Sequence, residues 1–173
     1  MHAVWLVATG LCLLGLTIRT GYEVGKLRGR ANLRSRGLFA VVFVAMCTML
    51  LAWPVMCPHD PWRLAVPGVV RWLGLGLALA ALALALGGMV QLRGVENIDH
   101  LVTTGLFSRI RHPMYAGFIL WIVGWVVRDG ALVSLAVGLV GIGNILYWRH
   151  LEERALESGY GEVYRTYRQQ TWF

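Results

Sequence analysis

The sequence is poor in charged residues, and especially in acidic ones. Only 14% of its 173 residues are charged, and Asp and Glu together number nine. Soluble domains carry about 25% charged residues, so the composition argues against a soluble globular domain. The apolar residues, 57% of the chain, gather in runs close to the roughly 20 residues that cross a bilayer as a helix. The length favours one membrane domain over residues 1–173.

Cysteine is also scarce, and two common sequence patterns are missing. Cys12, Cys47 and Cys57 lie in or at the end of apolar runs, with no histidine at ligand spacing. We therefore expect no metal site and no disulfide framework. The strand alternation of a membrane barrel is absent, as is the Gly-rich turn of a soluble nucleotide-binding α/β domain. The predicted fold class is all-α, a polytopic integral membrane helical bundle.

Apolar runs predict about five transmembrane helices. Their expected ranges are about 3–19, 38–57, 69–92, 113–128 and 131–149. The last two form a hairpin, and we expect the site to lie at the end of the bundle away from its turn. No Lys or Arg precedes the first run, so we expect a retained helix and not a cleaved signal peptide.

Several glycines lie inside these runs, where small residues let neighbouring helices approach closely. They are Gly74, Gly117, Gly124, Gly138, Gly141 and Gly143. Gly74 also belongs to a lone Gly-x-Gly, which is a weak signal for a nucleotide loop. We therefore interpret these glycines as packing positions.

Basic residues are distributed unevenly between the two ends of the predicted helices. Of the 16 Lys and Arg residues, only Arg63, Arg71 and Arg128 fall on one side. The others lie in segments 19–37 and 93–112 and in the C-terminal tail. The positive-inside rule then predicts a cytoplasmic C-terminus and an outside N-terminus, in a bacterial inner membrane. This layout explains the net charge of +7 without a nucleic-acid partner.

A first polar stretch, 99–117, is more elaborate than a membrane anchor needs. Pro113 suits the first position of a helix, where its missing N–H is tolerated. His112 then lies at the helix entrance and Tyr115 in the first turn, beside free N–H groups that suit a carboxylate. The alternative is an interfacial cap, in which Arg111 meets lipid phosphate and Tyr115 joins the aromatic belt.

A second polar stretch follows the last apolar run. Arg149 precedes Glu152 and Glu153 by three and four residues, which places all three on one helical face. The simple interpretation is a solvated salt bridge that contributes about 0.2–0.5 kcal/mol. Adjacent carboxylates where a helix leaves an anionic membrane are less expected. They suggest a cationic partner, such as an amino group or a sulfonium.

Together the two stretches resemble the isoprenylcysteine carboxyl methyltransferase family and the related phospholipid methyltransferases. The shared parts are Leu101-Val102-Thr103-Thr104-Gly105, the pattern Arg-His-Pro-x-Tyr-x-Gly at 111–117, and Glu152-Glu153 followed by Gly161 and Tyr164. The resemblance covers about residues 90–170, so we expect the catalytic region in 90–173. The chain is similar to compact prokaryotic members, because it lacks the extra N-terminal helices of the eukaryotic enzymes.

The resemblance implies a methyltransferase that uses S-adenosylmethionine and releases S-adenosylhomocysteine. The acceptor would be a carboxylate, amine or thiol on a lipophilic small molecule or lipid that enters from the bilayer, so membrane lipids are expected partners. The residues implied to bind the cofactor are His100, Leu101, Val102, Phe107, His112, Pro113, Met114, Tyr115, Glu152 and Glu153. Among them, Glu152 would pair with the cofactor's amino group.

Two residues are predicted to be catalytic. The eukaryotic enzymes have a substrate-binding arginine four residues before the first glutamate of the pair, where this chain has Trp148. Arg149 is next to it, and we expect Arg149 to orient an anionic acceptor. His112 would assist deprotonation of an acceptor that needs it.

Two other functions remain compatible with the helical frame. A membrane reductase with a nicotinamide cofactor would need a site for a larger phosphorylated ligand, for which the chain is short. A non-catalytic membrane subunit would have no charged residues inside its bundle.

Overall fold

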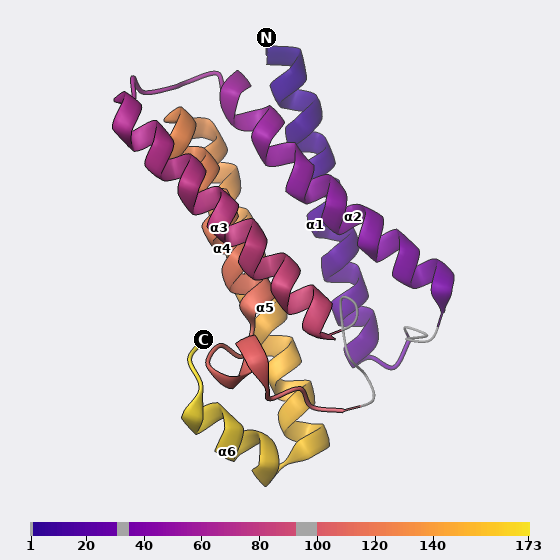
Figure 1. Cartoon of the computed structure of the whole chain (residues 1–173). Coiled ribbons are helices and arrows are strands. Elements are labelled where there is room, and N and C mark those ends of the chain that lie inside the picture. Colours follow the sequence, from indigo (N-terminus) through magenta and orange to yellow (C-terminus); the bar gives the residue numbers. More distant parts are fainter. Residues whose placement is uncertain (1, 31–34, 93–99) are drawn as a thin grey trace.

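The chain forms a bundle of long helices with a small cap at one end (Figure 1). The structure is a computed structural model that describes residues 2–30, 35–92 and 100–173. Its helices and 3-10 turns are α1 (His2–Leu27), α2 (Arg36–Met56), η1 (Cys57–His59), α3 (Gly68–Leu92), η2 (Gly105–Ser108), α4 (Pro113–Asp129), α5 (Leu132–Tyr160) and α6 (Glu162–Gln170). Within the described ranges there is no β-strand, only two isolated bridges. The predicted all-α class is confirmed.

Within the described part of the chain, four helices are long and apolar enough to cross a membrane. They are α1, α2 with η1, α3 and α5. Their outer faces carry large apolar side chains that water would not tolerate in such numbers; Trp72 and Val90 on α3, for example, are 74% and 76% exposed. Since lipid is the solvent that such a surface requires, the chain is an integral membrane protein.

The remaining predicted segment, 113–128, forms α4, which is shorter and more enclosed than a typical span. At 1.5 Å per residue its 17 residues extend about 25 Å, against about 30 Å of hydrocarbon. Ten of its residues are buried. The described residues thus contain four longer candidate spans, which is near the five that the sequence predicted, and α4 packs among them as an inner helix.

Glycines set the spacing between α3 and α4. An ideal Cβ on Gly124 would lie 2.7 Å from the backbone nitrogen of Ala78, and one on Gly74 would lie 2.6 Å from that of Arg128. A Cβ on Gly117 would meet the carbonyl oxygen of Ala81 at 2.7 Å. The two backbones therefore touch along most of α4, as the sequence predicted.

The expectation for the glycines of α5 is met unevenly. A Cβ on Gly138 would lie 2.8 Å from Cγ2 of Ile122, which is a close approach to α4. A Cβ on Gly141 would make an ordinary contact at 3.5 Å. Nothing lies within 4 Å of the Cβ position of Gly143, so the packing role predicted for it is wrong. It lies on a part of α5 that no other described element covers.

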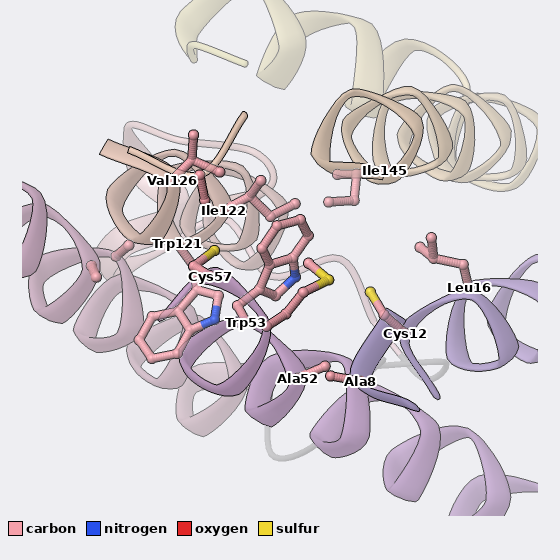
Figure 2. Packing of buried hydrophobic residues seen from close by; sticks show 14 of the residues in the cluster. Ala8, Cys12, Leu16, Ala52, Trp53, Cys57, Trp121, Ile122, Val126 and Ile145 are labelled. Carbon is pink, nitrogen blue, oxygen red and sulfur yellow. The ribbon is translucent and has the colours of Figure 1, made fainter. Parts of the chain in front are cut away.

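The largest buried cluster joins all five long helices, α1 to α5. Figure 2 shows part of it, including Cys12 of α1, Trp53 of α2, Trp121 of α4 and Ile145 of α5. The indole of Trp121 donates a hydrogen bond to the carbonyl of Leu50, 3.0 Å away. Aromatic side chains bury large areas, so this cluster fixes α4 between the other helices.

A distant aspartate caps the start of α5. The Asp60 side chain, in the connection between α2 and α3, accepts a 2.5 Å hydrogen bond from the backbone N–H of Ser134 and a longer one from that of Val133. A carboxylate is favourable at the positive end of a helix, and it satisfies N–H groups that have no partner within the helix. Asp60 therefore anchors the N-terminal end of α5, which is the end of the bundle opposite α6.

One prediction concerns the contact between α3 and α4. Gly124→Ala should lower thermal stability in detergent, because the added methyl group would collide with backbone atoms that cannot move aside; overpacking of this kind is destabilising by about 1–3 kcal/mol. Gly143→Ala is the matched control, with open space around its Cβ. Its melting temperature should be unchanged or slightly higher, since Ala favours helix. Equal melting temperatures for the two variants would contradict the close approach.

Candidate cofactor pocket

A cavity lies where α4 begins and α5 ends. Its walls come from the segment before α4, from α5 and α6, and from Leu92 at the end of α3. The parts of the chain that form it lie at the same end of the molecule as α6 and the C-terminus (Figure 1).

The structure brings together nine of the ten residues that the sequence assigned to the cofactor. The nine that line the cavity are His100, Leu101, Val102, Phe107, His112, Pro113, Met114, Tyr115 and Glu152. The tenth, Glu153, lies beside the cavity and contacts His112. Residues 93–99, which precede this set, lie outside the described residues.

Helix α4 begins where the sequence predicted. Pro113 is its first residue and His112 precedes it, buried and without a capping hydrogen bond from its side chain. The imidazole stacks on the ring of Tyr115, with centroids 5.5 Å apart and planes 16° apart. Tyr115 is only 3% exposed and its hydroxyl accepts a hydrogen bond from Arg19, so it does not join an aromatic belt at the membrane surface.

The two adjacent glutamates have different surroundings. Glu153 Oε1 contacts Nε of Arg111 at 3.3 Å, Nη2 of Arg149 at 3.2 Å and Nε2 of His112 at 3.5 Å. Among the described residues, the basic side chain within 4 Å of the Glu152 carboxylate is His112, whose Nδ1 lies 3.7 Å away, and the Glu152 side chain is 26% exposed. Glu153 is thus neutralised by the protein, whereas Glu152 presents its charge to the cavity.

Arg111 holds the C-terminal segment against the cavity. Its guanidinium donates to the carbonyl oxygens of Arg168 and Thr171, and its backbone N–H donates to the carbonyl of Trp172. The N–H of Trp172 in turn donates to the carbonyl of Arg109, 2.8 Å away. The sequence left open a contact between Arg111 and lipid phosphate, but the side chain, 8% exposed, is occupied within the protein.

Two tyrosines of α6 complete the wall, and the residue-by-residue assignment missed them as cofactor contacts. The Tyr167 hydroxyl donates to the carbonyl of Phe107, and burial raises its pKa to about 12, so it stays protonated. Burial also raises the pKa of Tyr164, whose hydroxyl has no hydrogen-bond partner among the described residues. The signal for them was their spacing of three residues on a short helix, which places both on one face.

Arg149 lies outside this cavity. It pairs with Glu153 on the next turn of α5, and its guanidinium carbon lies 4.6 Å from the ring centroid of Phe173. An anionic acceptor would have to displace both contacts to reach it.

Among the described residues, no group of three or more His, Cys, Asp or Glu side chains could hold a metal ion.

A second prediction follows from the Arg111 contacts. Arg111→Gln should speed hydrogen exchange at the amide of Trp172 by about an order of magnitude, because hydrogen bonds to a charged group stabilise by about 1.5–3 kcal/mol. Arg109→Gln, which removes an exposed positive charge two residues earlier, should leave that amide protected. Exchange measured by mass spectrometry tests both variants. Unchanged protection in Arg111→Gln would mean that the C-terminal segment is held by other contacts.

Known proteins share the part of the chain that builds the cavity. A family model described as phospholipid methyltransferase matches residues 69–163. Methanethiol S-methyltransferase of Pseudomonas sp. (strain GM41(2012)) is 30% identical over 129 residues, which cover 69% of this chain and 49% of that protein. Its counterpart in Pseudomonas deceptionensis is 36% identical over 112 residues, covering 60% of this chain and 42% of that protein.

A eukaryotic relative matches a shorter region. Protein-S-isoprenylcysteine O-methyltransferase of Schizosaccharomyces pombe is 34% identical over 80 residues, covering 42% of this chain and 32% of that protein. The chain therefore spans about half, or less, of the length of these curated relatives. No solved structure matches it significantly. The family match covers more than half of the chain and every helix that lines the cavity except α6, and the chain belongs to the phospholipid methyltransferase family.

Proposed function

We propose that the protein is an S-adenosylmethionine-dependent methyltransferase that acts on a lipophilic acceptor from the bilayer. The observation that carries the proposal is that nine of the ten residues implied by the family resemblance line one cavity at the end of a membrane bundle. The names of the relatives describe methyl transfer to the sulfur of methanethiol and to an oxygen of isoprenylcysteine. Both nucleophiles are within the acceptor class that we propose.

The cavity has the chemistry that S-adenosylmethionine requires. Apolar side chains such as Leu101, Val102 and Phe107 offer a slot for the adenine ring. Glu152 also lines the cavity, and its basic neighbour is farther away than those of Glu153. Its carboxylate is therefore suited to pair with the cofactor's ammonium group. The first turn of α4, which starts at Pro113, has N–H groups without helical partners and can receive the cofactor's carboxylate.

When bound, S-adenosylmethionine supplies an electrophilic methyl group on a sulfonium. The contribution of this chain is to position that group and to exclude water. The stacked rings of His112 and Tyr115 separate the cavity from the bundle interior. For an amine or thiol acceptor, His112 is the candidate base, because its Nε2 has no hydrogen-bond partner among the described residues; a carboxylate acceptor needs no base.

We further propose that the cavity faces the cytoplasm of a bacterial cell, across its inner membrane. At this end Arg28, Arg30 and Arg109 lie in segments that connect helices, and Arg154 lies near the end of α5. The opposite end has Arg63, Arg71 and Arg128, and Arg128 is paired with Asp129. Positive charge is retained on the cytoplasmic side during membrane insertion.

A third prediction tests the cofactor. S-adenosylhomocysteine titrated into the detergent-purified protein should show saturable binding by calorimetry. Glu152→Ala should weaken it about 10- to 100-fold, because a charge-assisted hydrogen bond contributes about 1.5–3 kcal/mol. His112→Ala should weaken it less, because it removes packing and no charge partner of the ligand.

The matched control is Glu162→Ala, which removes an exposed carboxylate, 80% accessible, from α6. It should bind as the unaltered protein does. If the unaltered protein does not bind S-adenosylhomocysteine, the proposed function is wrong. If Glu152→Ala binds as tightly as Glu162→Ala, the cofactor lies elsewhere.

A fourth prediction concerns orientation. A green fluorescent protein fused after Phe173 should be fluorescent in a bacterial host, and alkaline phosphatase fused there should be inactive, because the first folds in the cytoplasm and the second outside it. The same reporters inserted after Arg63, at the other end of the bundle, should give the reverse result. Active phosphatase at the C-terminus would place the cavity on the outside.

A further inference from the structure

One hydroxyl group in the wall of the cavity is left without a hydrogen bond. It belongs to Tyr164 of α6, which lines the cavity and is 0% exposed. The oxygen is closed off from water, and no atom of the described residues forms a hydrogen bond with it. Burying a polar group without a partner is unfavourable, so a native protein retains such a group for a reason.

The neighbouring tyrosine on the same helix face has a structural role. The Tyr167 hydroxyl donates a 2.6 Å hydrogen bond to the carbonyl oxygen of Phe107. The rings of Tyr164 and Tyr167 lie 6.1 Å apart between their centroids, and both line the cavity. The two hydroxyls therefore share one wall, where one is bound by the protein and the other is available to a ligand.

The turn between α5 and α6 gives Tyr164 this position. Gly161 lies between the two helices with φ of +52°, a conformation that residues with a Cβ rarely adopt. The chain changes direction there, and α6 turns away from the line of α5 (Figure 1). Arg165 of α6 pairs with Glu157 of α5 and with Glu162. These contacts link α6 to the end of α5 and help to fix Tyr164 in the wall.

The surroundings of Tyr164 place it at the end of the cavity that contains the glutamates. Burial raises the pKa of its hydroxyl, and the negative charges of Glu153 and Glu152 raise it further. Arg111 acts in the opposite direction, but its guanidinium is occupied by the C-terminal segment. The hydroxyl is therefore protonated at neutral pH and can donate a hydrogen bond.

A donor at this end is suited to the amino-acid group of the proposed cofactor. Glu152 is the carboxylate that we propose to pair with the cofactor's ammonium group. The cofactor's own carboxylate is attached to the same carbon atom as that ammonium group, so the two groups bind side by side. Tyr167, by contrast, reaches Phe107, which belongs to the proposed adenine slot.

We propose that the Tyr164 hydroxyl donates a hydrogen bond to the carboxylate of the bound cofactor. The inference rests on the proposed methyltransferase function, and it adds a side-chain donor to the N–H groups at the start of α4. A hydrogen bond to an ionised acceptor is stronger than one between neutral groups. Because the hydroxyl is closed off from water, the side chains around it must part slightly on binding; hydrogen bonds in such sites often tighten only in the complex.

The test compares two ligands that differ only in this carboxylate. S-adenosylhomocysteine and its decarboxylated analogue, S-adenosyl-3-thiopropylamine, are titrated by calorimetry into the full chain purified in detergent. Tyr164→Phe should weaken binding of the first ligand about tenfold and of the second by less than about twofold, because only the first loses a hydrogen bond to a charged group.

Thermal stability without ligand separates recognition from structure. Tyr164→Phe should keep or raise the melting temperature, since it removes a buried hydroxyl that has no partner among the described residues. Tyr167→Phe is the matched variant. It should lower the melting temperature, because the carbonyl of Phe107 loses this donor, and it should change the two affinities by the same factor.

The control is Tyr147→Phe, which removes a hydroxyl from a tyrosine of α5 that is 46% exposed and does not line the cavity. It should leave the melting temperature and both affinities unchanged.

Equal weakening of both ligands by Tyr164→Phe would overturn the inference, and so would unchanged binding of S-adenosylhomocysteine. In either case, binding of S-adenosylhomocysteine by the unaltered protein would still support the proposed function, and only the role of the Tyr164 hydroxyl would fail. If the unaltered protein binds neither ligand, the proposed function fails and this inference fails with it.

Discussion

The ionic contacts of Glu153 hold the functional end of the molecule together. One carboxylate oxygen contacts Arg111 before α4, His112 at the entrance of α4 and Arg149 on α5. Arg111 extends these contacts to the C-terminal segment through three acceptors on Arg168 and Thr171. Segments about 40 residues apart in sequence are thereby fixed at one point, which leaves the neighbouring Glu152 free of strong partners. Glu153 thus stabilises the protein's own structure, and Glu152 is the glutamate proposed to contact a ligand.

Much of this site follows from the sequence because its signals are local. Proline at a helix start and glycines at helix contacts have a single physical explanation each, and the structure has Pro113 and Gly124 in those roles. The positions that hold Glu152 and the 111–117 motif were also recognisable by spacing. What spacing does not reveal is the partner across the fold, so the contacts of Glu153 with Arg111 and His112 were not predicted, and Tyr164 and Tyr167 were not assigned as cofactor contacts.

The charges inside the bundle were the feature that sequence patterns predicted least well. Hydropathy falls at Arg19, so the first span was expected to end there, near residue 19. In the structure α1 continues to Leu27, and Arg19, Glu23 and Lys26 form an ion-paired group on one side of it. Charges three and four residues apart can neutralise one another on a helix, which a count of single residues does not include. Such charges are not expected in a purely structural membrane subunit, because buried charge in a bilayer is unfavourable.

Helix α4 is shorter than the hydrocarbon layer of a typical bilayer. A helix of about 25 Å in hydrocarbon of about 30 Å leaves a mismatch that must be accommodated by thinning of the bilayer or by a sunken helix end. The end of α4 that begins at Pro113 borders the cavity. Thinning of the bilayer around that end would bring the lipid headgroups closer to the site, so the acyl-chain length of the surrounding lipids becomes a physical variable of the site.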